Sequence, residues 1–180
     1  MLLSCQLSYY SQNYCTITLQ YCVYPKFNTN NTSWKVVADR DGTLRLQDSE
    51  STMEYYGLYW EGISNNTFPM NEGFCVSGED TATFLEDSLR KLGLIDREIN
   101  EFIVYWLPKM EINNYNLITF QTEAYTDLAK LDVYPEPDTI IRVFMTFKPL
   151  DNPIDIEPQE LTTPDRGGFV VVEWGGTELE

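Results

Sequence analysis

Histidine is absent from all 180 residues of this chain. Imidazole is the side chain that proteins most often use for proton transfer near neutral pH, and it is the commonest metal ligand. Its absence excludes Ser-His-Asp and Cys-His catalytic arrangements and every His-ligated metal site. The glycine patterns of P-loop and Rossmann phosphate sites are also missing. We therefore expect no cofactor and no metal, and an enzyme is the less favoured interpretation of the chain.

Positive charge is scarce, because 12 Lys and Arg residues face 28 Asp and Glu residues and leave a net charge of −16. Such a chain is repelled by phosphate backbones and by anionic lipid, which argues against binding to nucleic acid or to a membrane surface. No apolar run reaches the 18 residues that a membrane span requires. No signal peptide is visible at the start of the chain. A protein partner or self-association is the expected kind of interaction, and carbohydrate is a possible ligand.

Cysteines are few and are not spaced for zinc. The four are Cys5, Cys15, Cys22 and Cys75, and no Cys-x-x-Cys pair occurs among them, so a structural zinc site is not expected. Two disulfides and four free thiols are both compatible with this pattern. Three glycosylation sequons begin at Asn30, Asn31 and Asn65, and they carry glycans only if the chain is secreted from a eukaryotic cell.

Aromatic residues are plentiful at 14% of the chain, including twelve tyrosines, and such residues favour strands and contact surfaces. An Asp-Gly turn at residues 41–42 predicts a β-hairpin between residues 34–38 and 43–47. Alternating or continuous apolar patterns predict further strands. These strands are expected at residues 16–20, 54–61, 74–76, 117–125, 130–134, 139–148 and 169–174.

The clearest helical signal lies in the middle of the chain. Apolar residues at helical spacing predict helices over about 79–92 and 96–107, the second ended by Pro108. The short link between them predicts a helical hairpin, which needs a sheet to pack on. We therefore expect an α+β fold, mainly an antiparallel sheet or sandwich, in a single domain over residues 1–180. Residues 150–168 are acidic and contain three prolines, which predicts an extended loop.

The strongest candidates for chemistry are two carboxylates next to tryptophans, Glu61 after Trp60 and Glu173 before Trp174. Two carboxylates beside aromatic platforms are what a glycosidase uses, one as acid and one as base or nucleophile. The alternative, which we favour, is that both acids are structural residues at strand ends. Trp34 and Trp174 are the candidates for stacking on a sugar or on a partner.

Several phrases resemble a family of uncharacterised, mainly bacterial, β-rich proteins, many of them exported or surface-associated. The phrases, between Tyr24 and Gly176, are residues 59–62, 78–81, 100–111, 115–118, 142–145 and 172–176. Members of that family usually open with a Lys-Pro-Val-Ile-Tyr-Leu-Tyr-Pro segment, which this chain does not have. The resemblance implies an extracellular or surface location and implies no catalytic residue.

Three functions are compatible with these features. The favoured hypothesis is a non-catalytic β-rich surface or extracellular module that serves assembly, adhesion or a structural role. The second is a carbohydrate-binding or carbohydrate-cleaving domain that uses carboxylates near tryptophan. The third is an acidic intracellular regulator that binds a basic partner.

Overall fold

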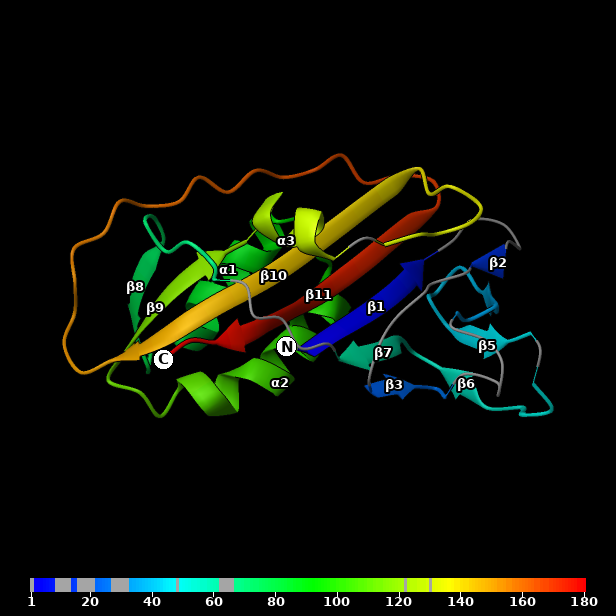
Figure 1. The fold of residues 1–180 in the computed structure, drawn as a ribbon, viewed down its shortest axis with the longest axis horizontal. Coiled ribbons are helices and arrows are strands. Elements are labelled where there is room, and N and C mark those ends of the chain that lie inside the picture. Colours follow the sequence, from blue (N-terminus) through cyan, green and yellow to red (C-terminus); the bar gives the residue numbers. More distant parts are fainter. Residues whose placement is uncertain are drawn as a thin grey trace. The chain divides into compact units, whose positions relative to one another are not determined.

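A computed structural model describes residues 2–8, 14–15, 22–26, 33–47, 49–61, 67–121, 123–129 and 131–180. The described chain has the α+β fold that the sequence predicted, and it contains two sheets and three helices (Figure 1). Its internal contacts divide it into two compact units. Unit 1 comprises residues 1–64, 125–142 and 165–174, and unit 2 comprises residues 65–124, 143–164 and 175–180. The expectation of a single domain stays a prediction.

Unit 1 contains strands from two sheets. The first has the order β3 (Cys22–Tyr24), β7 (Leu58–Glu61), β1 (Leu2–Ser8), β11 (Val170–Glu178) and β10 (Thr139–Leu150), and unit 1 holds the first part of β11 and of β10. The second has the order β2 (Tyr14–Cys15), β4 (Val36–Ala38), β5 (Leu44–Leu46) and β6 (Glu54–Tyr55). Strands β3 and β6 are therefore terminal strands of their sheets within the described chain.

The β4–β5 hairpin confirms the Asp-Gly turn. Val36 pairs with Leu46 and Ala38 pairs with Leu44 in antiparallel register. Gly42 has a φ of 85°, a left-handed conformation that costs glycine little. Val36, Ala38 and Leu44 are buried, so this hairpin contributes one apolar face to the core of unit 1.

The aromatic segment 54–61 was predicted as one strand, and the structure divides it in two. Residues 54–55 form β6 beside β5, whereas residues 58–61 form β7 beside β1 and β3. A bend at Tyr56 and Gly57 separates them. Period-two alternation continues through such a bend, so the pattern alone does not reveal that the chain changes sheets.

Unit 2 is built on the remaining sheet strands, in the order β11, β10, β9 (Tyr115–Phe120) and β8 (Phe74–Ser77). Strand β10 pairs with β9 from Met145 opposite Phe120 to Leu150 opposite Tyr115. Two helices accompany these strands, α1 (Thr81–Lys91) and α2 (Asp96–Met110). They pack against each other, which confirms the predicted helical hairpin.

The helices bury the apolar stripes that the sequence predicted. Leu85 and Leu89 of α1 are inaccessible to solvent, and Phe102 and Trp106 of α2 are 0% and 4% exposed. The Trp106 ring meets the Phe147 ring of β10 edge-on, with centroids 6.0 Å apart. An edge-to-face aromatic pair of this kind stabilises by about 0.5–1.5 kcal/mol beyond the area it buries. This contact packs the hairpin on the sheet of unit 2.

Helix α2 runs three residues beyond its predicted end. Pro108 lies inside its last turn, and the helix continues to Met110. A proline cannot donate to the carbonyl four residues earlier, which here belongs to Val104. Val104 is 75% exposed, so water can satisfy that carbonyl and the proline is tolerated near the helix end.

One predicted strand ends too late, and another is absent from the described chain. The run 117–125 holds β9 only to Phe120, and it is followed by a short helix, α3 (Glu123–Leu128). Residues 131–134 form no strand. The predicted strand at residues 16–20 lies outside the described residues. Strands β10 and β11 match their predictions within a few residues.

Residues 151–169 join β10 to β11 without a helix or a named strand, as expected for the acidic, proline-containing segment (Figure 1). Most of them are exposed. One isolated parallel bridge links Glu157 of this segment to Glu72. Nowhere in the described chain is a helix both long and apolar enough to span a membrane.

Candidate functional site

Glu173 belongs to a buried ionic cluster in unit 1 with Arg142 and Tyr125. Glu173 on β11 is 0% exposed, and the Arg142 side chain on β10 is 9% exposed. Arg142 Nε donates to Glu173 Oε2, and Arg142 Nη1 donates to the Ala129 carbonyl at 2.7 Å. The guanidinium carbon lies 4.6 Å from the centroid of the Tyr125 ring of α3. The cluster therefore connects the C-terminal end of α3 to β10 and β11.

The charges of this cluster depend on one another. Burial lowers the pKa of Arg142, but Glu173 and then Tyr125 raise it, and together they leave that pKa above its ordinary value. Burial and then the negative charge of Glu173 raise the pKa of Tyr125. Tyr125 is therefore a neutral phenol beside a closed ion pair. A pair removed from solvent in this way has the character of a structural element, because no substrate can reach the carboxylate.

Glu61 does not join this cluster. It lies half-buried on β7, where its register partners are Leu2 and Cys22. Strand β1 lies between β7 and β11 in the sheet, so the two acids belong to strands about 10 Å apart. No hydrogen bond or ion pair connects Glu61 with Glu173 among the described residues.

The two tryptophans proposed for stacking lie in the interior of unit 1. Trp34 is 2% exposed, and its Nε1 donates to the Pro25 carbonyl at 2.6 Å. Trp174 is 4% exposed. A ring must present an open face to stack on a sugar, and neither ring does so in this structure.

The remaining predicted positions are the asparagines of the glycosylation sequons and the four cysteines. Asn30, Asn31 and Asn65 lie outside the described residues, as do the side chains of the first three cysteines. Cys75 is a free thiol on β8, and its Sγ accepts a hydrogen bond from the Ile154 amide at 3.4 Å.

A group of exposed residues in unit 1, most of them aromatic, was not singled out from the sequence. We use the name edge patch for Tyr24 on β3 and for three residues in and beside β6, namely Met53, Tyr55 and Tyr56. Tyr24 on β3 and Tyr55 on β6 meet edge-on, with ring centroids 5.8 Å apart. Tyr24 is 52% exposed, Tyr56 63% and Met53 55%. The terminal strands β3 and β6, which belong to different sheets, lie near each other (Figure 1), and Tyr24 and Tyr55 make the contact between them.

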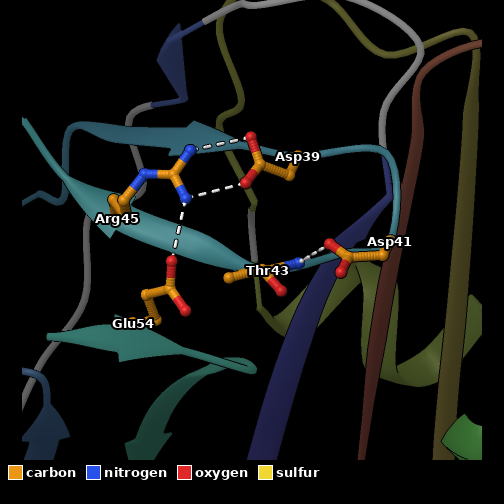
Figure 2. A network of polar contacts seen from close by, with 5 residues as sticks. All are labelled: Asp39, Asp41, Thr43, Arg45 and Glu54. Carbon is orange, nitrogen blue, oxygen red and sulfur yellow. Dashed lines mark hydrogen bonds and ion pairs between the residues drawn. The ribbon is translucent and has the colours of Figure 1, made fainter.

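An ionic network holds the β6 side of the edge patch in place. Figure 2 shows Arg45 of β5 reaching Asp39, at 2.7 and 2.8 Å, and Glu54 of β6, at 3.1 Å. The hydrogen bond to Asp39 is the main cause of the raised pKa of Arg45. In the adjoining turn, Asp41 Oδ1 accepts from the Thr43 amide at 3.0 Å. The network ties β6 to the hairpin and so fixes the residues that flank it.

High tyrosine content was the signal for the edge patch, but it does not give a location. Tyr24 and Tyr55 are 31 residues apart, and only the folding of the two sheets brings them together.

Comparison with known proteins does not identify a function: no family model, curated protein or solved structure matches the chain. The family resemblance of the sequence therefore stays an expectation.

Proposed function

We propose that this chain is a non-catalytic β-rich module that binds another protein through the edge patch, in an assembly or adhesion role at a surface or outside the cell. The observation that carries the proposal is the contact between Tyr24 and Tyr55, which joins the terminal strands of two sheets under exposed aromatic rings. Tyrosine and methionine are enriched in protein interfaces, where they bury a large area.

Terminal strands give such a surface a second means of recognition. Their outward N–H and C=O groups can pair with an extended segment of a partner, which then adds a strand to the sheet. The tyrosines would contact the alternate side chains of that segment. With a net charge of −16 on the module, a partner segment with flanking Lys or Arg residues would associate fastest.

The test is selection of peptides from a random displayed library on the full chain, followed by affinity measurement. We expect enriched peptides to be extended and apolar with basic flanks. The Tyr24→Ser/Tyr56→Ser variant should weaken their binding about tenfold or more, because buried tyrosines are frequent hot spots. Tyr134→Ser is the matched control, since Tyr134 is 76% exposed and lies outside the edge patch.

Hydrogen exchange locates the bound peptide independently of the variants. Protection on peptide binding should concentrate at Tyr24 and residues 53–56. If the peptides bind the double variant as tightly as the natural chain, or if protection falls in unit 2, the edge patch is not the interface. Light scattering of the free chain shows whether the same patch also mediates self-association.

A further inference from the structure

Unit 2 contains a cavity of about 450 Å³ at the end of β9. Polar residues dominate its wall, among them Asn71, Glu72, Thr119, Gln121, Glu157 and Gln159. Its volume lies within the range of small-molecule sites. None of these residues belongs to the edge patch or to the Glu173 cluster, so the cavity is a separate feature.

Backbone contacts fix the wall contributed by the segment between β10 and β11. The Gly73 amide donates to the Glu157 carbonyl at 2.9 Å, beside the parallel bridge between Glu72 and Glu157. The Gln159 side-chain amide makes the two hydrogen bonds to Phe120 that the backbone of a neighbouring strand would otherwise make. Its Nε2 donates to the Phe120 carbonyl at 2.7 Å, and its Oε1 accepts from the Phe120 amide at 2.9 Å. The cavity is thus preformed by paired backbone.

Gln121 presents an acceptor to this cavity. The residue is only 4% exposed, and its Nε2 donates to the Pro69 carbonyl at 2.8 Å and to Thr146 Oγ1 at 3.0 Å. A carbonyl can only accept, so the contact with Pro69 fixes which end of the amide is nitrogen. Among the described residues no donor reaches Gln121 Oε1. An acceptor left open at the wall of a cavity can accept a hydrogen bond from a ligand that donates.

Glu72 and Glu157 add negative charge to the same wall. Residues opposite each other in a bridge project from the same face, where like charges destabilise the pairing. Both residues are exposed, and within the described part of the chain neither forms an ion pair. A cation between them would remove the repulsion, and its N–H groups could also reach Gln121.

We propose that this cavity binds an organic cation through an ammonium or guanidinium group, which donates to Gln121 Oε1 and neutralises Glu72 and Glu157. Such groups carry several donors and no acceptor, and so match a wall of acceptors. A hard metal ion takes six or more oxygen ligands at short range, and the described residues contain no group of three acidic or thiol side chains arranged for a metal. The cation is either a free polyamine or a basic side chain of a peptide.

NMR titration of the ¹⁵N-labelled full chain tests the proposal, with the Gln121 side-chain NH₂ and the Gly73 amide as reporters. Nα-acetyl-L-arginine amide and spermidine represent the two sources. Nα-acetyl-L-citrulline amide, which replaces the guanidinium by a neutral urea, is the matched control ligand. We expect saturable shifts of both reporters with one or both cations and none with the citrulline compound; the tighter cation identifies the source.

Substitutions test whether the carboxylates are responsible. Glu72→Gln/Glu157→Gln should weaken binding about fivefold or more, and higher salt should weaken binding to the natural chain. Glu160→Gln removes one exposed charge from the same segment outside the cavity wall and should leave the affinity unchanged. Equal binding by the double variant, equal shifts with citrulline amide, or absence of shifts with both cations overturns the proposal. Saturable shifts with CaCl₂ but not with the cations would overturn it in favour of a metal.

Discussion

At the scale of single residues, the ion pair of Arg142 and Glu173 is the interaction whose disruption should lower the free energy of unfolding most. Both side chains are almost completely buried, so each charge depends on the other for the stabilisation that water would give. Removing one partner leaves a buried charge without compensation, which lowers the free energy of unfolding strongly. Replacing both partners by apolar residues would lower it much less. Glu173 is therefore better understood as part of the core than as a catalytic acid.

Glu173→Gln should lower the free energy of unfolding by about 3–5 kcal/mol, because it leaves the Arg142 guanidinium buried without its counter-ion. Chemical denaturation monitored by tryptophan fluorescence measures the loss. Glu61→Gln, the same change on a half-buried strand residue, should have a much smaller effect. A loss below about 1 kcal/mol for Glu173→Gln would contradict the burial of the pair.

Tyr125 gives the cluster a dependence on alkaline pH. Its pKa is raised from the ordinary value of 10.0, first by burial and then by the charge of Glu173. Above about pH 10 the unfolded chain releases this proton and the folded chain retains it, so stability is complete below that pH and declines above it. Above pH 10 the free energy of unfolding should fall more steeply with pH for the natural chain than for the Tyr125→Phe variant. The difference between the two slopes should be about 1.4 kcal/mol per pH unit. Parallel slopes for the two proteins would contradict the assignment.

At the scale of elements, the helical hairpin of unit 2 comes very close to β11. A Cβ on Gly176 of β11 would lie 2.3 Å from the Met145 carbonyl oxygen and 3.0 Å from Cζ2 of Trp106. Backbone cannot yield to such an overlap without moving the strand. The absence of a side chain at Gly176 is therefore required first by the Met145 backbone of β10 and then by the Trp106 ring of α2.

Gly176→Ala should lower the free energy of unfolding by about 1–3 kcal/mol through overpacking. Gly167→Ala is the matched control, because a Cβ there meets no atom within 4 Å, and it should change stability by no more than about 0.5 kcal/mol. Thermal and chemical denaturation compare the two variants. Equal effects would show that the approach of β11 to Trp106 is not as close as described.

Elements with strong local signals were predictable from the sequence. The β4–β5 hairpin follows from Asp41 and Gly42, and the helical hairpin follows from stripes at helical spacing. Elements that depend on distant contacts were not. Helix α3 occupies part of a predicted strand because Tyr125 is buried against residues far away in sequence, and tertiary packing overrides the strand preference of the segment.

The candidate sites were less predictable than the fold for the same reason. Glu173 was recognised as unusual, but its partner Arg142 is 31 residues away and carries no motif. Composition alone does not show whether Trp34 and Trp174 lie in the core or at the surface, because their burial results from tertiary packing. Gln121 gave no signal, since its exposed acceptor results from two hydrogen bonds made by its other atom.

At the scale of the whole molecule, the net charge of −16 on 180 residues lowers the free energy of unfolding. Like charges repel more strongly in the compact state than in the unfolded chain, and dissolved salt screens this repulsion. The midpoint of thermal unfolding should therefore rise as NaCl increases from low concentration to about 0.15 M, where the Debye length is near 8 Å. Differential scanning calorimetry measures the change. A midpoint that falls with salt would mean that attractive surface pairs outweigh the excess of acid.

The hydrogen-bonded side chain of Gln159 has a consequence for how the chain tolerates change in length. Its amide, paired with Phe120, holds the segment between β10 and β11 together with the Glu157 carbonyl, which accepts from the Gly73 amide. Insertions on either side of residues 157–159 would lengthen exposed chain without moving this anchor. A replacement of Gln159 would remove both hydrogen bonds to Phe120 and leave the contact between Gly73 and Glu157. The segment therefore has an exposed stretch after residues 157–159 that is open to grafted sequences, while Glu157 and Gln159 keep their contacts with unit 2.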